Sequence, residues 1–286
     1  MWLIFALLSA LFAGITAILA KVGIKNADSD VATSIRTGIV LVISWLAAFI
    51  AGSVNYEAFA SAGTRTYLFL VLSGTATGIS WLCYFKALKL GDISAVTPVE
   101  RSSNVLTVLL AFIILKESVT LFKGIGTALM TAGTLLMILK KKYDYKNHDR
   151  RWIIYAVLSA AFGALNAIFG KIGVSGIESD LATAIRTVVV FIIAWLIVFG
   201  QKKQSLVRSV DRRSMFFICL SGITTGATWL CYYRALRTGE ACIVTPIDKL
   251  SIIPTVAFAY IFLKEKLSAR AFFGLCLIVA GTVMMI

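Results

Sequence analysis

Two nearly identical stretches decide the architecture of this chain: WLCYFKALKLGD at residues 81–92 and WLCYYRALRTGE at residues 229–240. The match extends outward in the same register, because SGTATGIS at 73–80 is answered by SGITTGAT at 221–228, again 148 residues later. Nearer the N-terminus the offset is 150, and residues 2–22 match their counterparts at ten of 21 positions. The chain therefore consists of two copies of one unit.

Composition places both copies in a lipid bilayer. The 286 residues are 59% apolar and only 15% charged, and the mean hydropathy is +0.89, far from the balance of a soluble domain. Apolar segments recur along the chain, each long enough to cross a hydrocarbon core of about 30 Å as a helix. The ten expected segments are 2–22, 31–51, 67–88, 94–115, 119–139, 152–172, 181–200, 215–236, 242–263 and 268–286. We expect the first to be a retained helix and not a signal peptide.

An odd number of helices in each copy requires the two copies to cross the membrane in opposite directions. The predicted fold is therefore an all-α integral membrane protein of ten transmembrane helices, built from two inverted five-helix repeats. The repeats span residues 1–139 and 152–286, and a basic connector, KKKYDYKNHDRR, spans 140–151.

Loop charges test the inversion independently, because lysine and arginine in short loops stay on the cytoplasmic side. Residues 51–66 carry only Glu57 and Arg65, whereas the equivalent loop at 200–214 carries five cations and one acid. The central connector carries six cations. We therefore expect this connector to be cytoplasmic and both termini to lie outside, in the plasma membrane of a prokaryote.

Inverted repeats are a physical signature of secondary transporters, which rock two related units about a shared midplane site. The chain lacks a glycine-rich nucleotide loop, a convergent nucleophile and base, and a metal-ligand set, so we expect neither an enzyme nor a cofactor or metal. The cations are spread over short loops, which excludes a nucleic-acid partner. A small organic solute, the lipid bilayer and, as one coupling ion, the proton are the expected partners of a monomer. The alternatives are a flippase for lipids or lipid-linked metabolites and a scaffold that transports nothing.

The residues also resemble a known family. The arginines early in the second helix of each copy, Arg36 and Arg186, and the stretches LTVLLAFIILKESVT (106–120) and PTVAFAYIFLKEKLS (254–268) resemble EamA-type members of the drug/metabolite transporter superfamily. The resemblance implies paired five-helix units, transport of a small metabolite, and a gating or charge-balancing role for both arginines. The proton-coupling glutamate of the small multidrug branch is absent here. Ten-helix relatives are usually described with cytoplasmic termini, whereas the charges here predict termini outside.

Aromatic side chains on the third and eighth expected helices are candidates for the solute site. Helical spacing puts Trp81 on one face with the glycines at 74 and 78, and Trp229 on the matching face of the second copy. Tryptophan faces attract organic cations and stack on planar rings, although packing or an interfacial belt would use the same residues. The substrate-binding candidates, including two polar positions related by the repeat, are Trp81, Tyr84, Trp229, Tyr232, Tyr233, Thr16 and Asn166.

Charged pairs that follow two prolines are the other candidates. Glu100 and Arg101 follow Pro98, and the repeat places an acid and a base at the same positions of the second copy. An unbroken helix would carry them about 9 Å into the membrane, where charges are costly unless they are paired or face water. We expect coupling or solute binding, or a structural salt bridge, from Glu100, Arg101, Asp248, Lys249, Arg36 and Arg186. For Arg36 and Arg186, an equally plain interpretation is an ion pair with the acid at the start of the same helix, Asp30 or Asp180. Lys171 is expected to anchor its helix at the membrane interface.

Overall fold

The computed structural model describes residues 1–23, 27–90, 96, 99–100, 102–118, 120–138, 151–263 and 269–286. Within these ranges the chain is helical, with no strand. The first copy contains α1 (Trp2–Gly23), α2 (Ser29–Ile50), α3 (Tyr56–Ser61), α4 (Thr64–Leu90), α6 (Ser103–Leu115) and α7 (Leu121–Ile138). The second contains α8 (Arg151–Ser175), α9 (Ser179–Gly200), η3 (Gln204–Ser209), α10 (Arg212–Thr238), α11 (Ala241–Asp248), η4 (Lys249–Ser251), α12 (Ile252–Leu263) and α13 (Ala269–Met285).

Six of these helices, α1, α2, α4, α8, α9 and α10, are long and apolar enough to cross a membrane, and three described helices are apolar but shorter. The chain is thus a multi-pass membrane protein. Eight of the ten expected segments coincide with a helix to within three residues at each end. The ninth, expected as one helix over 242–263, is instead broken into α11, η4 and α12. The fourth, expected over 94–115, is represented by the shorter α6, which begins at Ser103. Ten membrane crossings therefore stay a prediction.

Prolines on both sides accompany the break in the ninth segment. Pro246 lies inside α11, two residues before the helix ends at Asp248, and Pro254 is the third residue of α12. Proline has no backbone N–H and its ring clashes with the carbonyl four residues earlier, which for Pro254 is the carbonyl of Leu250. A short 3-10 turn over Lys249–Ser251 follows before α12 begins. Asp248 and Lys249 consequently lie at an interruption and not in the middle of a regular helix.

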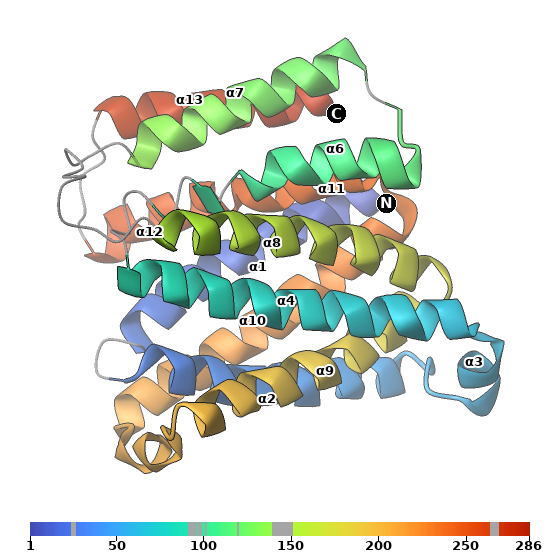
Figure 1. The fold of residues 1–286 in the computed structure, drawn as a ribbon, viewed down its shortest axis with the longest axis vertical. Helices are drawn as coiled ribbons and strands as arrows, with labels where there is room; N and C mark the ends of the chain where they lie inside the picture. The colour runs from blue at the N-terminus through green and yellow to red at the C-terminus, as the bar shows by residue number, and fades with distance from the viewer. Residues whose placement is uncertain are drawn as a thin grey trace.

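Most helices of one half pack against helices of the other half. Helix α4 of the first half packs along α8 of the second, α10 of the second packs along α1 of the first, and α2 packs against α9. Helices α7 and α13 form a further pair, at the top of Figure 1, and contact α6, α11 and η4. Each half therefore supplies surfaces that the other half covers.

Glycines allow the closest of these approaches, as their spacing suggested. A Cβ atom at Gly74 of α4 would lie 2.8 Å from Cβ of Val189 on α9. In the other half, a Cβ atom at Gly222 of α10 would lie 2.8 Å from Cβ of Ile39 on α2. The same small residue thus makes the same kind of contact twice, each time with a helix of the opposite half.

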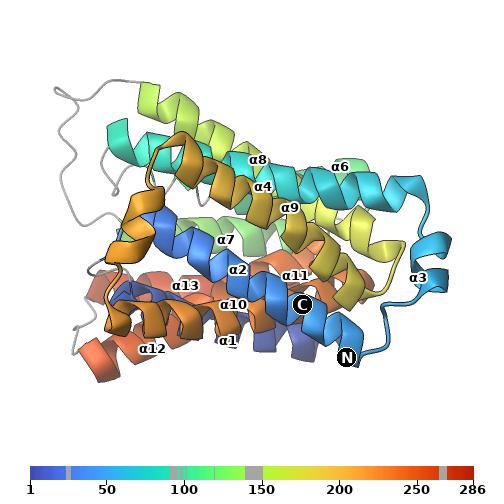
Figure 2. The same cartoon turned by 90° about the horizontal axis from the view of Figure 1, so that it is seen from below.

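The two ends of the helix bundle hold different segments of the chain. Both chain termini lie at one end of the bundle, together with α3, whereas α8 begins at the opposite end (Figures 1 and 2). Helix α1 starts at the end with the termini and runs away from it, and α8 runs towards it (Figure 1). The first helices of the two halves therefore run in opposite directions along the bundle.

Candidate solute site between the two halves

A polar cavity lies between helices of the two halves. Its first part, which we call the Arg186 chamber, has a volume of about 160 Å³ and is lined by residues of α6, α8, α9, α10, α11 and η4, including Asn166, Arg186, Trp229, Tyr232, Tyr233 and Asp248. The second part, the Trp81 chamber, has a volume of about 360 Å³ and includes Thr77, Ser80, Trp81, Tyr84 and Glu100. Both chambers are lined by Ser103, Gly163, Asn166 and Lys249, so they adjoin.

Arg186 is the central charged group of its chamber. Its side chain is buried, with 2% of the residue exposed. Nε donates a hydrogen bond to Oγ of Ser73 at 3.0 Å, and Nη2 donates to Oγ1 of Thr77 at 2.7 Å and to Oδ1 of Asn166 at 3.1 Å. These partners come from α4 and α8. The guanidinium orientation is therefore held by three neutral side chains on two other helices.

Two aromatic rings of α10 lie against the same guanidinium. Its Cζ is 4.6 Å from the ring centroid of Trp229 and 5.0 Å from that of Tyr233. Tyr233 is buried and meets Tyr232 edge-on, with ring centroids 5.3 Å apart. The Tyr232 hydroxyl lies 3.2 Å from Oγ1 of Thr245. The structure thus brings together Asn166, Arg186 and the three aromatic candidates of the second half.

The candidates of the first half occupy different places. Trp81 and Tyr84 line the Trp81 chamber with Glu100. Thr16 donates to Oγ1 of Thr224 at 2.7 Å, so the position related to Asn166 makes a contact between α1 and α10. Arg36 is half-buried on α2. The repeat is therefore not symmetric in detail, and the arginine that reaches the cavity is the one in the second half.

The predicted acid–base pairs are only partly described. Asp248 lines the Arg186 chamber and accepts a hydrogen bond at 2.7 Å from the hydroxyl of Ser9, a fully buried residue on α1. Lys249 lines both chambers, and Glu100 lines the Trp81 chamber. Arg101 lies outside the described residues. Three of the four predicted charges thus line one cavity.

Two plain interpretations of charge pairing are wrong. Asp30 does not pair with Arg36, because the ammonium of Lys203 is 2.5 Å from Asp30 and 2.8 Å from Asp28. The described contacts of Arg186 are with the neutral Ser73, Thr77 and Asn166 and with two rings, and not with Asp180. Lys171 donates to the carbonyls of Leu236 at 2.6 Å and Gly239 at 2.7 Å, and its expected place at the membrane interface stays a prediction. Local sequence spacing could not show these partners, because each lies on another element.

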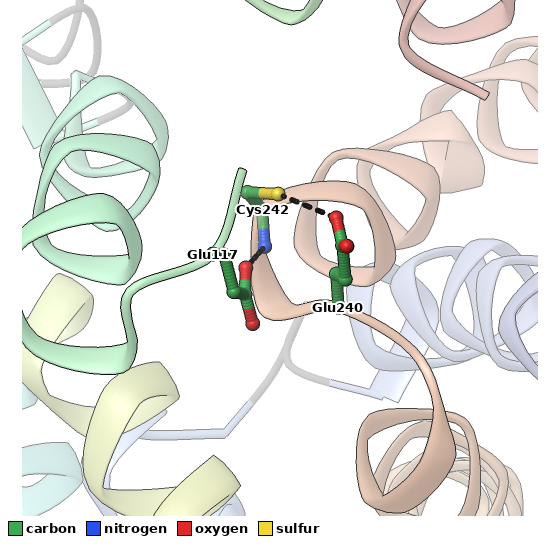
Figure 3. Close-up of side chains that lie close together, drawn as sticks. All are labelled: Glu117, Glu240 and Cys242. Atoms are coloured by element: carbon green, nitrogen blue, oxygen red, sulfur yellow. Dashed lines mark hydrogen bonds between the residues drawn. The ribbon is translucent and has the colours of Figure 1, made fainter. Parts of the chain in front are cut away.

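A cluster that the sequence analysis missed joins the end of α6 to the start of α11. Glu117 accepts a hydrogen bond from the backbone N–H of Ala241 at 2.7 Å. It accepts another from the backbone N–H of Cys242 at 2.9 Å (Figure 3). Glu240 accepts one from the ammonium of Lys123. A Cβ atom at Gly239 would lie 3.0 Å from the Trp2 ring, which places the cluster beside the N-terminus. We call Glu117, Lys123, Glu240 and the start of α11 the α11 clasp.

The α11 clasp resembles a metal site only in its distances. Ligand atoms of Glu117, Glu240 and Cys242 lie within 4.8 Å of one another. However, both oxygens of Glu117 are used by the amides at the start of α11, where a carboxylate is favoured, and Glu240 already has a cation as partner. The Lys123 hydrogen bond lowers the pKa of the Glu240 carboxyl below its ordinary value. These contacts explain the cluster as a fastening between helices.

Comparison with known proteins gives the family. The model of the EamA-like transporter family matches residues 1–139 and again residues 150–286. This chain belongs to the EamA-like transporter family. It is therefore a membrane transporter in the general sense, and the cavity between its halves is the place where a transported solute would be sought.

Two proteins similar in sequence to this EamA-like chain are each about half as long. A Sinorhizobium protein described as an uncharacterized transporter in the cobO 3′ region is 44% identical over 137 residues, which are 48% of this chain and 97% of that protein. An uncharacterized protein of Methanocaldococcus jannaschii is 29% identical over 133 residues, 46% of this chain and 94% of that protein. A crystal structure described only as that of a protein has a similar fold, with a TM-score of 0.83 and 13% identity over 99% of this chain and 96% of that one.

Proposed function

We propose that the chain is a secondary transporter that carries a small organic solute by alternating access at the cavity between its halves. The observation that carries the proposal is the cavity itself, because helices of both halves line it and a rocking motion of one half against the other would change its openings. The opposite directions of α1 and α8 and the half-length relatives support inverted, duplicated units.

The charge distribution supports an orientation in the membrane. The loop with η3, which carries Lys202, Lys203 and Arg208, lies at the end where α8 begins, and the nearly neutral segment with α3 lies at the other end, with the termini (Figure 1). Because cations in short loops remain cytoplasmic, we place the η3 end in the cytoplasm and both termini outside. A bacterial relative supports the plasma membrane of a prokaryote as the location.

We assign proton coupling to Glu100 or Asp248. Both carboxylates line the cavity, and ionisable side chains within a membrane are rare and mark the paths of ions, protons and substrates. Ser9 holds Asp248 in place through its hydroxyl. A single chain supplies both halves of the cavity, which supports a monomer as the transporting unit.

The experiment that tests this function is transport into proteoliposomes, with labelled amino acids, quaternary amines and nucleobases, with and without an imposed pH gradient. We expect uptake that responds to the gradient, and we expect that response to be lost in Glu100→Gln or Asp248→Asn. Uptake that is the same without a gradient and in both variants would make the protein a facilitator with structural acids. If no solute moves, a lipid-linked cargo or a scaffold replaces the proposal.

A further inference from the structure

One nitrogen of the Arg186 guanidinium differs from the other two in its hydrogen bonding. Nη1 is buried and has no hydrogen-bond partner among the described residues, while Nε and Nη2 together donate three hydrogen bonds. Buried polar groups in native proteins are nearly always bonded, and an unsatisfied charged donor is especially costly. Arg186 lines the cavity, so an unbonded nitrogen on this residue requires an explanation.

The charge of Arg186 is also without a counter-ion in the described part of the chain. All three hydrogen-bond acceptors are neutral. The rings of Trp229 and Tyr233 offset part of the cost of burying a cation, but isolated buried charges are normally paired with an opposite charge. Both the open donor and the uncompensated charge indicate that an anionic oxygen completes this site.

We propose that Nη1 of Arg186 binds the carboxylate of the transported solute. This inference rests on the proposed function, since it names the chemical class of solute that the same cavity takes. Ser73, Thr77 and Asn166 fix the guanidinium from two other helices, so its free edge is preorganised. A carboxylate suits that edge because it accepts charge-assisted hydrogen bonds from arginine in the plane of the guanidinium.

The other charges of the cavity favour a monoanion over a doubly charged phosphate. Asp248 lines the same chamber as Arg186, Glu100 lines the adjoining one, and Lys249 lines both, so two cations are balanced by two carboxylates and a dianion would find no net positive charge among these groups. Asp248 accepts only the Ser9 hydroxyl among the described contacts, and its carboxylate could also receive an ammonium group of the solute. A simple monocarboxylate and a zwitterion share the proposed contact, and the experiment below separates them.

The first test is binding of small probes to the purified protein in detergent, measured as the shift in melting temperature at constant ionic strength. Propionate carries the carboxylate alone, glycine carries a carboxylate and an ammonium group, and propionamide has the shape of propionate without the charge. We expect propionate to raise the melting temperature in a saturable way and propionamide not to do so. A larger shift with glycine than with propionate would identify a zwitterion. Equal shifts with propionate and propionamide would overturn the proposal.

Three substitutions locate the contact. Arg186→Gln should raise the half-saturating propionate concentration by at least about tenfold, the usual effect of losing a charge-assisted hydrogen bond. Asn166→Asp is a gentler change, because it places a carboxylate where an amide oxygen lies 3.1 Å from Nη2. This resident anion should abolish the propionate response while the protein stays folded.

The control is Arg234→Gln, which removes an exposed cation one residue from Tyr233 and should leave the response intact. A response that survives Asn166→Asp would show that the anion binds elsewhere.

Transport separates this inference from the proposed function. If carboxylates bind saturably but no solute crosses the proteoliposome membrane, the transport proposal fails and the binding site stands. If amines or nucleobases are transported equally by wild-type protein and by Arg186→Gln, the protein is a transporter and the carboxylate assignment is wrong. Uptake of carboxylates that is lost in Asn166→Asp, and kept in Arg234→Gln, supports both.

Discussion

At the scale of single residues, this transporter uses related positions of its two halves in different ways. Asn166 holds Arg186 through its amide oxygen, whereas Thr16, at the related position, bonds to Thr224. Tyr233 lies against Arg186, and the related residue is a phenylalanine, which has no hydroxyl. A few substitutions after duplication are enough to give one half a polar arginine site and the other half a different set of contacts.

Trp229 should contribute to solute affinity through Arg186. Its ring supports the buried guanidinium at 4.6 Å, and a cation–π contact of this kind is worth about 1 to 2 kcal/mol when desolvated. We expect Trp229→Ala to raise the half-saturating concentration of a transported solute by about tenfold, and Trp229→Phe to raise it less. Concentration-dependent uptake in proteoliposomes measures both. Unchanged affinity in Trp229→Ala would mean that this ring serves packing alone.

At the scale of helices, close contact between neighbours depends on which side of a helix a glycine faces. Gly124 and Gly126 both lie on α7. A Cβ atom at Gly126 would lie 2.5 Å from the carbonyl oxygen of Gly281 on α13, whereas one at Gly124 would have no atom within 4 Å. Glycine is therefore required at position 126, whereas position 124, two residues earlier on the same helix, has room for a larger side chain.

The two glycines give a matched pair of substitutions. Gly126→Ala should lower the melting temperature, because α7 and α13 would have to separate. Gly124→Ala should leave it unchanged or raise it, since alanine favours a helix over glycine by about 1 kcal/mol. Thermal unfolding of the two purified variants in the same detergent measures the difference. Equal effects of the two substitutions would contradict the packing described for α7 and α13.

The α11 clasp should make stability depend on pH. Lys123 lowers the pKa of Glu240 below its ordinary value, so the pair stabilises the folded protein fully above the unfolded-state pKa of about 4.3. That contribution is lost as the pH falls further, through the lowered pKa of the folded state. We expect Glu240→Gln to lower the melting temperature at pH 7 and to differ less from wild type at pH 3.5. A difference that grows on acidification would have the wrong sign.

At the scale of the whole molecule, the two halves depend on each other for packing and for the site. Helix α4 is covered by α8, and α1 is covered by α10. The acceptors that fix Arg186, on the second half, include Ser73 and Thr77 of the first. Neither half alone would complete the cavity, which explains why residues so far apart in the chain meet there.

Orientation can be tested by labelling with a membrane-impermeant thiol reagent. We expect Asn55→Cys, beside α3, to be labelled in intact cells, and Ser205→Cys, in η3, to be labelled only after the membrane is opened. The positive-inside rule is the physical reason, since basic residues surround Ser205 and few surround Asn55. Native cysteines are controlled for with the unsubstituted protein. The reverse pattern would place both termini in the cytoplasm.

The sequence by itself determined the membrane class, the duplication and most helix boundaries, because hydropathy and repeat register are local properties of the chain. It also indicated Arg186, Asn166 and the aromatic residues as candidates. Only the tertiary structure decided that Arg186 contacts Ser73, Thr77 and Trp229, that Asp30 pairs with Lys203, and that Glu117 fastens α11. These contacts join segments distant in sequence, and the packing of whole helices, not residue spacing, selects which side chains meet.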